Sequence, residues 1–225
     1  MKKLFVFSYD DGTVHDIKMI SILNQYGIKA TFNLNSGLKD YVWYTEGKAI
    51  KRLDLEAHKS LYDGHEVAVH TVTHPYLTEL DDEMLYKEVV DDQKALSNIF
   101  GYNVIGMGVP FDQCTNEIVE KIRSYGVIEH LRFPTWDGSF ELPKDPMYIP
   151  ITIEHTHKEV DKLIDQYIEL KPDDLKLFVL VGHSYDFYVE NNWDWLEKNL
   201  EKLKRAEDIH IVTMKEAVEI IFNKK

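Results

Sequence analysis

Strand-like and helix-like segments alternate along the whole chain, and this alternation limits the possible folds more than any other feature of the sequence. The apolar runs at 3–9 and 175–183 are typical of buried strands, and the segments 13–27 and 81–100 have the apolar spacing of amphipathic helices. Because strands that alternate with helices form parallel βαβ units, the sequence predicts an α/β protein built on a parallel sheet.

Shorter segments continue the same pattern. Further strands are expected at 28–34, 65–70, 103–109 and 209–213, and further helices at 116–126, 158–170 and 195–206. The apolar residues expected to face inward are Ile17, Ile20 and Leu23 in the first helix and Leu85, Val89, Leu96 and Ile99 in the helix at 81–100. Thr213 and Glu216 have the spacing of a capping box at the start of a terminal helix.

No linker rich in Gly, Ser or Pro divides the chain, so we expect a single domain over residues 1–225. About seven strand–helix units of roughly 30 residues each would fill this length. That number favours a closed or nearly closed barrel over a six-stranded open sheet. In such barrels the chemistry gathers in the loops that follow the strands, at their C-terminal ends.

The composition excludes several classes of partner. The chain carries 26 Lys and Arg against 39 Asp and Glu, a formal net charge of −13, which disfavours binding to nucleic acid or anionic membranes. Cys114 is the only cysteine, so no internal disulfide is possible.

The apolar stretch after Met1 is too short for a secretion signal, and no apolar run is long enough to span a bilayer. With Met1 as the natural start, we expect a cytoplasmic protein.

Three polar clusters stand where predicted strands end. Asp10 and Asp11 follow the first strand, His70 and His74 follow the strand at 65–70, and His183 ends the strand at 175–183. Taken alone, the aspartates are typical of a turn, the histidine pair arises easily by chance, and His183 is typical of a buried core residue. Because all three clusters share one position in a barrel, we expect them to meet at one mouth.

Two neutral imidazoles and one carboxylate, with positions left open, form the usual ligand set of a catalytic zinc site. The metal lowers the pKa of a bound water toward neutrality. One aspartate of the 10–11 pair would then ligate the metal, and its neighbour would accept a proton from that water.

Three stretches resemble motifs of a known family. "FSYDDG" at 7–12, "HEVAVHTVTHPYLTEL" at 65–80 and "LVGHSYDF" at 180–187 look like the first, second and fifth motifs of the polysaccharide deacetylases, carbohydrate esterase family four. The similarity runs from about Leu4 to about Phe187. It implies the distorted (β/α) barrel of that family, in agreement with the alternation of strands and helices.

The resemblance also implies residue roles. Asp10 would be the catalytic base, His183 the general acid, and Asp11, His70 and His74 the ligands of one divalent metal ion, usually zinc and sometimes cobalt, manganese or nickel. The implied reaction is metal-dependent hydrolysis that removes acetyl groups from a carbohydrate, with N-acetyl favoured over O-acetyl.

The third motif of the family, Arg-x-Pro-aromatic, is altered here. The matching stretch is "GVPF" at 108–111, so the Phe111 N–H is expected to contribute to an oxyanion hole, but Gly108 replaces the arginine that would hold the catalytic aspartate. Arg132 either supplies a guanidinium from a neighbouring strand end or is a surface residue before a turn. Both alternatives stay open at this stage.

The fourth motif has no clean match. Trp136–Asp137 lies in the corresponding region, and Asp186, three residues after His183, is another group that could orient the acid. His155 and His157 lie near the end of another predicted strand, where they either line the mouth or are exposed, and we expect both to be exposed. Trp43, Tyr44, Trp136 and Trp193 either stack on sugar rings or pack in the core, the commoner fate of tryptophan.

Two other functions remain open. Relatives in the family cleave C–N bonds of small non-carbohydrate amides such as cyclic ureides or imides, with the same kind of site. The missing arginine is also compatible with a non-catalytic module that binds a metal or a sugar. The expected partner is therefore an acetylated sugar or a small amide, and the sequence makes no prediction of the oligomeric state.

Overall fold

The computed structural model describes residues 2–136 and 138–222. Its centre is a parallel sheet in which the strands follow one another in the order β8, β7, β6, β5, β2, β1, β10 and β9, and β11 pairs with one end of β1. The strands are β1 (Lys3–Asp10), β2 (Thr31–Leu34), β5 (Glu66–Val69), β6 (Gly106–Gly108), β7 (His130–Trp136), β8 (Ile149–Ile151), β9 (Ile153–Glu154), β10 (Lys176–His183) and β11 (Ile209–Ile211).

The two ends of this sheet are joined by one short stretch of chain. β8 pairs with β7 at one end of the sheet, and β9, which begins two residues after β8 ends, pairs with β10 at the other. The segment 149–154 therefore nearly closes the sheet into a barrel. The predicted barrel is confirmed, with eight strands around it and β11 in addition, against the seven or so expected.

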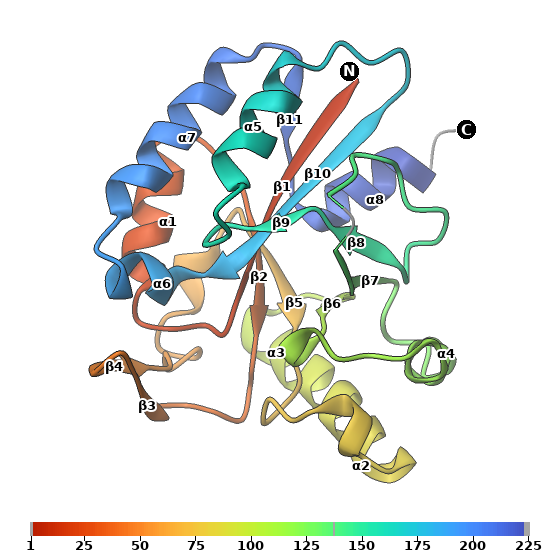
Figure 1. The fold of residues 1–225 in the computed structure, drawn as a ribbon. Coiled ribbons are helices and arrows are strands. Elements are labelled where there is room, and N and C mark those ends of the chain that lie inside the picture. Colours follow the sequence, from red (N-terminus) through yellow and green to blue (C-terminus); the bar gives the residue numbers. More distant parts are fainter. Residues whose placement is uncertain (1, 137, 223–225) are drawn as a thin grey trace.

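Helices connect the strands and cover the barrel (Figure 1). They are α1 (Asp16–Gln25), α2 (Asp82–Tyr86), η3 (Lys87–Asp91), α3 (Asp92–Phe100), α4 (Asn116–Ser124), α5 (Val160–Glu169), α6 (Ser184–Val189), α7 (Trp193–Arg205) and α8 (Met214–Phe222). The segments α2, η3 and α3 run on without a break, as the prediction of one helix over 81–100 required. Gly101 ends this helix in the left-handed conformation, with φ 76°.

The inward face of α1 was predicted in part. Ile20 and Leu23 are buried as expected, but Ile17 is 45% exposed, so its prediction was wrong. The neighbouring Asp16 occupies the inward position instead, where it accepts hydrogen bonds from Tyr62 and Ser184. A buried polar side chain therefore takes the inward place in the first turn of α1, and Ile17 faces outward.

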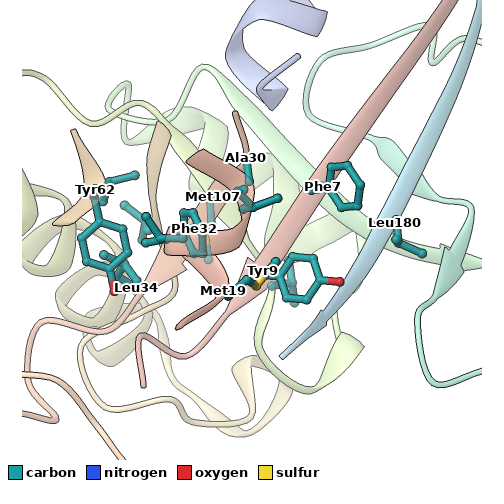
Figure 2. Packing of buried hydrophobic residues seen from close by; sticks show 14 of the residues in the cluster. Phe7, Tyr9, Met19, Ala30, Phe32, Leu34, Tyr62, Met107 and Leu180 are labelled. Carbon is teal, nitrogen blue, oxygen red and sulfur yellow. The ribbon is translucent and has the colours of Figure 1, made fainter. Parts of the chain in front are cut away.

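Alternate residues of β1 face two different surroundings, as a strand requires. Phe5, Phe7 and Tyr9 belong to the large core cluster that also contains residues of α1, α5 and α7 (Figure 2). Leu4 and Val6 belong to a smaller cluster that includes Ile149 and Ile151 of β8 and Met214 and Ala217 of α8. On this second face Ser8 and Asp10 replace the apolar residues toward the C-terminal end of the strand, and there the polar site begins.

A short antiparallel hairpin lies beside the barrel and was not predicted. It consists of β3 (Val42–Thr45) and β4 (Lys48–Lys51). Lys48 attaches it to the barrel by donating to the carbonyls of Tyr188 and Val189, at 3.0 and 2.7 Å.

Two further features concern the helices. The capping box of α8 is present, because the Glu216 carboxylate accepts from the Thr213 N–H and the Thr213 hydroxyl accepts from the Glu216 N–H, at 2.9 and 3.2 Å. Within the described part of the chain, none of the helices has the length and apolar character needed to cross a bilayer.

Candidate active site

The three polar clusters meet at one end of the barrel, as predicted. Asp10 stands opposite His183 in the pairing of β1 with β10 and opposite Asn33 in the pairing of β1 with β2. His70 directly follows β5. A cavity of about 620 Å³ opens here, and the predicted residues Asp10, Asp11, His70, His74, Phe111, Arg132 and His183 all line it.

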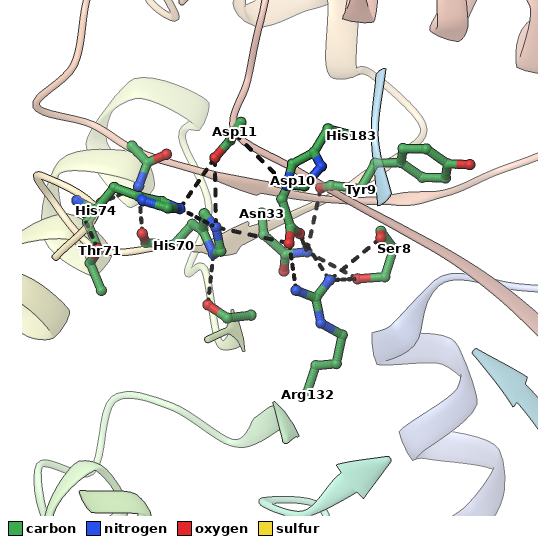
Figure 3. Close-up of polar contacts among 12 residues, drawn as sticks. Ser8, Tyr9, Asp10, Asp11, Asn33, His70, Thr71, His74, Arg132 and His183 are labelled. Carbon is green, nitrogen blue, oxygen red and sulfur yellow. Dashed lines mark hydrogen bonds and ion pairs between the residues drawn. The ribbon is translucent and has the colours of Figure 1, made fainter. Parts of the chain in front are cut away.

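Asp11, His70 and His74 bring three ligand atoms together. Asp11 Oδ1 lies 3.4 Å from His74 Nε2 and 3.8 Å from His70 Nε2, and the two Nε2 atoms are 3.2 Å apart (Figure 3). A tetrahedral zinc site with ligand distances of ~2.1 Å separates its ligand atoms by ~3.4 Å. The spacing of these three groups therefore fits a small divalent cation.

The chemistry of the donor atoms fits as well. His70 donates its Nδ1–H to the Gly108 carbonyl at 2.8 Å, which leaves Nε2 of the neutral ring with a free lone pair. Burial lowers the pKa of His70 and lowers that of His74 to about 3, so both rings are neutral at physiological pH. Asp11 Oδ1 is buried and accepts no hydrogen bond from the described residues.

Arg52 compensates the charge of Asp11. Its Nη1 atom lies 2.9 Å from Asp11 Oδ1 without the alignment of a hydrogen bond, and it also donates to the Asp11 carbonyl and to Asn35. Burial opposes ionisation of Asp11, but the Arg52 guanidinium and the charge of His183 keep its pKa below the usual range. The carboxylate is therefore ionised and ready to bind a cation.

Asp10 is held in a different way. Arg132 donates to both carboxylate oxygens, from Nη1 to Oδ1 at 2.9 Å and from Nη2 to Oδ2 at 2.6 Å, and Asn33 donates to Oδ1 at 2.7 Å. Burial opposes ionisation, but this pairing holds the pKa of Asp10 well below its usual range. Oδ2 lies 3.9 Å from His70 Nε2, so the ionised carboxylate faces the ligand set.

The geometry resolves the two alternatives for Arg132. The residue is buried and pairs with Asp10, so it is not a surface residue before a turn. Arg132 stands opposite Gly108 in the pairing of β6 with β7, so the guanidinium comes from the neighbouring strand at the same level. A Cβ atom at Gly108 would lie 2.7 Å from Asn33 Cγ, so the space beside Gly108 is filled by the Asn33 amide.

His183 faces the cavity from the other side. Its Nδ1 lies 3.1 Å from Asp186 Oδ2, and its Nε2 is 4.0 Å from Asp11 Oδ2. Burial opposes protonation, but the hydrogen bond to Asp186 and the charge of Asp11 raise the pKa of His183 to about 9. The ring is therefore a cation that can donate a proton. Of the two orienting groups considered from sequence, Asp186 makes the contact, and Asp137 lies outside the described residues.

Three of the predicted site residues have left-handed backbone conformations. Asp11, His74 and Phe111 have φ values of 88°, 58° and 55°, which are unfavourable for residues with a side chain. The Phe111 side chain is 47% exposed and packs against His74, with ring centroids 4.3 Å apart. Such backbone strain is typical of functional sites and agrees with the prediction that these residues have a role there.

The prediction for His155 was wrong, whereas His157 is exposed as expected. His155 is buried and stacks on Tyr9 and Phe187, with centroids 5.5 and 4.3 Å away. It fits there because Gly182 has no side chain, since a Cβ at that position would overlap the imidazole ring.

Asn33 and Arg52 belong to the site but were not predicted from the sequence. Asn33 lies within a predicted strand and Arg52 follows a hairpin that was not predicted, so neither stands at a recognisable strand end. The alternation of β2 identifies Asn33 as the residue level with Asp10 once the pairing of the strands is known. Arg52 carries no comparable signal.

Comparison with known proteins assigns the family. Residues 1–129 match the family model described as polysaccharide deacetylase, and the chain belongs to that family. The peptidoglycan-N-acetylglucosamine deacetylase PgdA of Listeria monocytogenes is 24% identical over 122 residues, which cover 53% of this chain. The match spans 24% of the length of that relative.

Solved structures show the same fold. The Xyl-CE4 domain of a multidomain xylanase from the hindgut metagenome of Trinervitermes trinervoides matches with a TM-score of 0.64 and 18% identity, over 98% of this chain and 91% of that one. A family 4 carbohydrate esterase pseudoenzyme from Bacillus anthracis matches with a TM-score of 0.59 and 14% identity, over 96% of this chain and 65% of that one. The fold therefore occurs both in a domain of a multidomain xylanase and in a pseudoenzyme, so the fold alone does not decide the function.

Proposed function

We propose that this protein is a metal-dependent hydrolase that removes acetyl groups from a carbohydrate, with N-acetyl groups favoured. The observation that carries the proposal is the position of Asp10. An ionised carboxylate, fixed by Arg132, lies 3.9 Å from an imidazole of the three-ligand set and shares the cavity with a protonated His183. A base, a cation site and an acid are thus present together, whereas a binding module needs neither the base nor the acid.

The protein groups have distinct roles in the reaction. A divalent cation held by Asp11, His70 and His74 would supply Lewis-acid polarisation of the acetyl carbonyl and lower the pKa of a bound water. Asp10 accepts the proton of the attacking water at its carboxylate. The Phe111 N–H donates a hydrogen bond to the oxygen of the acetyl group as negative charge develops there. His183 then protonates the departing nitrogen or oxygen, so that acetate and a free amine or hydroxyl are released.

Asp10 and Asp11 each pair with a different arginine, and this difference supports different roles for the two aspartates. Arg132 pairs with both carboxylate oxygens of Asp10, and Arg52 neutralises part of the charge of Asp11. Each aspartate is ionised, but only Asp11 presents a buried oxygen beside both Nε2 atoms. Asp10 is therefore assigned the proton and Asp11 the cation.

The proposal is tested by acetate release from a panel of N-acetylated oligosaccharides and O-acetylated sugars, and by ring opening of small cyclic amides. Each substrate is assayed with added zinc and after chelation. We expect zinc-dependent acetate release from the N-acetylated sugars. Turnover of a cyclic amide alone would assign the protein to the small-amide hydrolases of its family. No turnover of any substrate by folded, zinc-loaded protein would favour the non-catalytic module.

A further inference from the structure

Two of the three cation ligands lie on one short loop with a strained backbone. We name residues 70–74 the ligand loop, because His70 begins it and His74 ends it. Thr71 and His74 have φ values of 68° and 58°, in the left-handed region that is unfavourable for side chains and most of all for a β-branched one. Such a conformation persists only where the surrounding structure fixes it. Contacts around the ligand loop must therefore hold the two imidazoles in place.

Contacts on one side of the ligand loop provide part of this support. Thr71 Oγ1 accepts from the His74 N–H at 3.1 Å. Asn35 donates from Nδ2 to the carbonyls of His70 and Thr71, at 2.5 and 2.9 Å. The N–H groups of residues 72 and 73 have their acceptors on the other side, in the continuous helix formed by α2, η3 and α3.

Glu88 of that helix supplies these acceptors. It lies in η3, a π-helical turn, and such turns are frequent at functional sites. The Glu88 carboxylate accepts from the Thr73 N–H at Oε2 and from the Thr73 hydroxyl at Oε1, at 2.8 and 2.6 Å. The Glu88 carbonyl accepts from the Val72 N–H at 3.1 Å. One residue thus holds three polar groups in the middle of the ligand loop.

Asp92, four residues further along the same helix, holds the start of the ligand loop. Its Oδ2 accepts from the His70 N–H at 3.1 Å, and that N–H is shared with the Leu34 carbonyl at 3.0 Å. Its Oδ1 accepts from the Ser36 N–H at 2.8 Å. Asp92 therefore joins the segment after β2 to the segment after β5, at the residue that carries one of the ligands.

The burial of these two carboxylates needs an explanation. A buried carboxylate is costly unless hydrogen bonds compensate it, and both Glu88 and Asp92 are buried. Their hydrogen bonds go to the ligand loop and to Ser36. Neither residue lines the cavity. Any influence of Glu88 and Asp92 on the site therefore passes through the ligand loop.

We propose that Glu88 and Asp92 are positioning residues that set the affinity of the cation site. They hold the ligand loop in the conformation that keeps the Nε2 atoms of His70 and His74 3.2 Å apart. The inference rests on the proposed function, in which this site holds a cation, and it adds a support that comes from a helix. Outer contacts that orient metal ligands commonly change metal affinity by about 10- to 100-fold.

The first test replaces Asp92 by Asn, with Asp91→Asn as the matched control. Asparagine has the shape of aspartate but only one acceptor oxygen, so one of the two N–H groups at Asp92 would face an amide NH2 group. We expect the Kd for zinc, measured by competition with a chromophoric chelator, to rise about 10-fold. Asp91 is adjacent, its side chain is 56% exposed and it pairs with Lys94, so its replacement should leave the Kd within about twofold.

The second test compares Glu88→Ala with Glu88→Gln, and it stands even if Asp92→Asn does not fold. Glutamine retains both contacts with Thr73, because its oxygen accepts from the N–H and its NH2 group donates to the hydroxyl. We expect Glu88→Ala to raise the Kd for zinc about 10-fold and Glu88→Gln to stay within about threefold of the native value. Urea unfolding of the metal-free samples is measured as well, because a purely structural role lowers stability without changing the affinity of the folded protein.

The zinc affinities of the folded variants decide the inference. An unchanged Kd in Asp92→Asn and Glu88→Ala, or an equal rise in the Asp91→Asn control, would overturn it and leave the proposed hydrolase in place. The expected rises, together with a zinc-loaded native protein that hydrolyses no substrate of the panel, would support the inference and count against the proposed function alone. A native protein that binds no zinc would overturn both.

Discussion

The positive charge beside Asp10 is provided by Arg132 and not by residue 108, the position at which the third motif of the family predicts an arginine. The guanidinium that pairs with Asp10 comes from β7, one strand away from the glycine at the position of the family's arginine. Because Gly108 and Arg132 are level in adjacent strands, a side chain from either strand reaches the same carboxylate. Asn33 completes the arrangement by filling the space above Gly108 and donating to Asp10.

The role of Arg132 is tested through the pH dependence of activity. Arg132 lowers the pKa of Asp10, so its replacement by Met raises that pKa, and the base is then protonated at a higher pH than in the native protein. We expect kcat/KM to fall by about 100-fold and the acid limb of its pH profile to move to higher pH. The measurement is the pH profile of acetate release between pH 4 and 9.

Replacement of one partner of a buried ion pair also costs about 3 to 5 kcal/mol of stability, so Arg132→Lys serves as the second variant. Arg132→Lys keeps the positive charge but cannot donate to both carboxylate oxygens of Asp10 in the same way. It should shift the acid limb less than Arg132→Met. A folded Arg132→Met protein with an unchanged acid limb would show that Arg132 does not control the base.

We predict that position 108 tolerates only glycine, because Asn33 fills the space that a side chain would need. A substitution there is expected to lower the stability of the fold. A Cβ atom at position 108 would lie 2.7 Å from Asn33 Cγ and 2.8 Å from Asn33 Oδ1. We expect Gly108→Ala to lower the free energy of unfolding in urea by about 1 to 3 kcal/mol. In combination with Asn33→Ala the two losses should be less than additive, because the close contact is then absent. Full additivity would contradict this explanation.

The meeting of the polar clusters could be predicted where the signal was local, and contacts between neighbouring strands could not. Asp10, Asp11, His70, His74 and His183 were predicted to lie together because they stand at the ends of apolar strands or shortly after them. Arg132 was recognised only as one of two alternatives, since its partner is 122 residues away in the sequence. Arg52 and Asn33 act through contacts across the barrel mouth that spacing along the chain does not reveal.

At the scale of helices and strands, the long periodic segments were predictable and the short ones were not. β1, β10 and the helix over 82–100 are long and strongly patterned, and all were predicted. The β3–β4 hairpin has four residues in each strand and exposed side chains on one face, so its pattern is weak. The error at Ile17 has the same origin, because a buried Asp16 breaks the apolar pattern that predicts the inward face.

A buried lysine contributes to the attachment of helix α5 (Figure 1). Lys3 Nζ donates to the carbonyls of Tyr167, Ile168 and Leu170 at the C-terminal end of α5, at 3.1, 2.9 and 3.1 Å. Carbonyls at the end of a helix have no partner within the helix, and a cation there also interacts favourably with the helix dipole. Lys3 thereby attaches α5 to the start of β1.

We expect Lys3→Met to lower the free energy of unfolding by about 3 kcal/mol, because buried carbonyls then lose a charged donor. Lys2→Met is the matched control, since Lys2 is adjacent in sequence and exposed, and it should change the stability by less than about 0.5 kcal/mol. Both values come from urea unfolding followed by circular dichroism. Equal effects of the two substitutions would contradict the assigned role of Lys3.

At the scale of the whole molecule, the barrel brings together residues from β1, β5, β6, β7 and β10 that are distant in sequence. Alternation of strands and helices was enough to predict this architecture, because parallel strands bring their C-terminal ends to one face. A closed or nearly closed barrel was predicted, but β8 and β9, the two strands that nearly close it, were not, since they have only three and two residues.

Metal binding should stabilise the whole domain. A ligand that binds only the folded state at 100 times its Kd adds about 3 kcal/mol, which for a chain of this length raises Tm by about 6 to 10 °C. We expect this shift when zinc is added to the metal-free protein, and we expect His74→Ala to abolish most of it. His157→Ala is the control, because His157 is exposed and lies outside the ligand set. A zinc shift that His74→Ala leaves intact would place the cation elsewhere.

The role of Asp10 as the base beside a bound cation is tested most directly by acetate release from the N-acetylglucosamine pentamer. The native protein and Asp10→Asn are compared after the bound zinc of each sample has been determined and matched. We predict that the native activity is lost on chelation and returns with zinc. We also predict that Asp10→Asn, with the same zinc content, is slower by about 1,000-fold, because a positioned base contributes on that order to the rate. Equal rates for the two proteins, or acetate release that persists after complete removal of metal, would contradict the assignment of Asp10 as the base beside a bound cation.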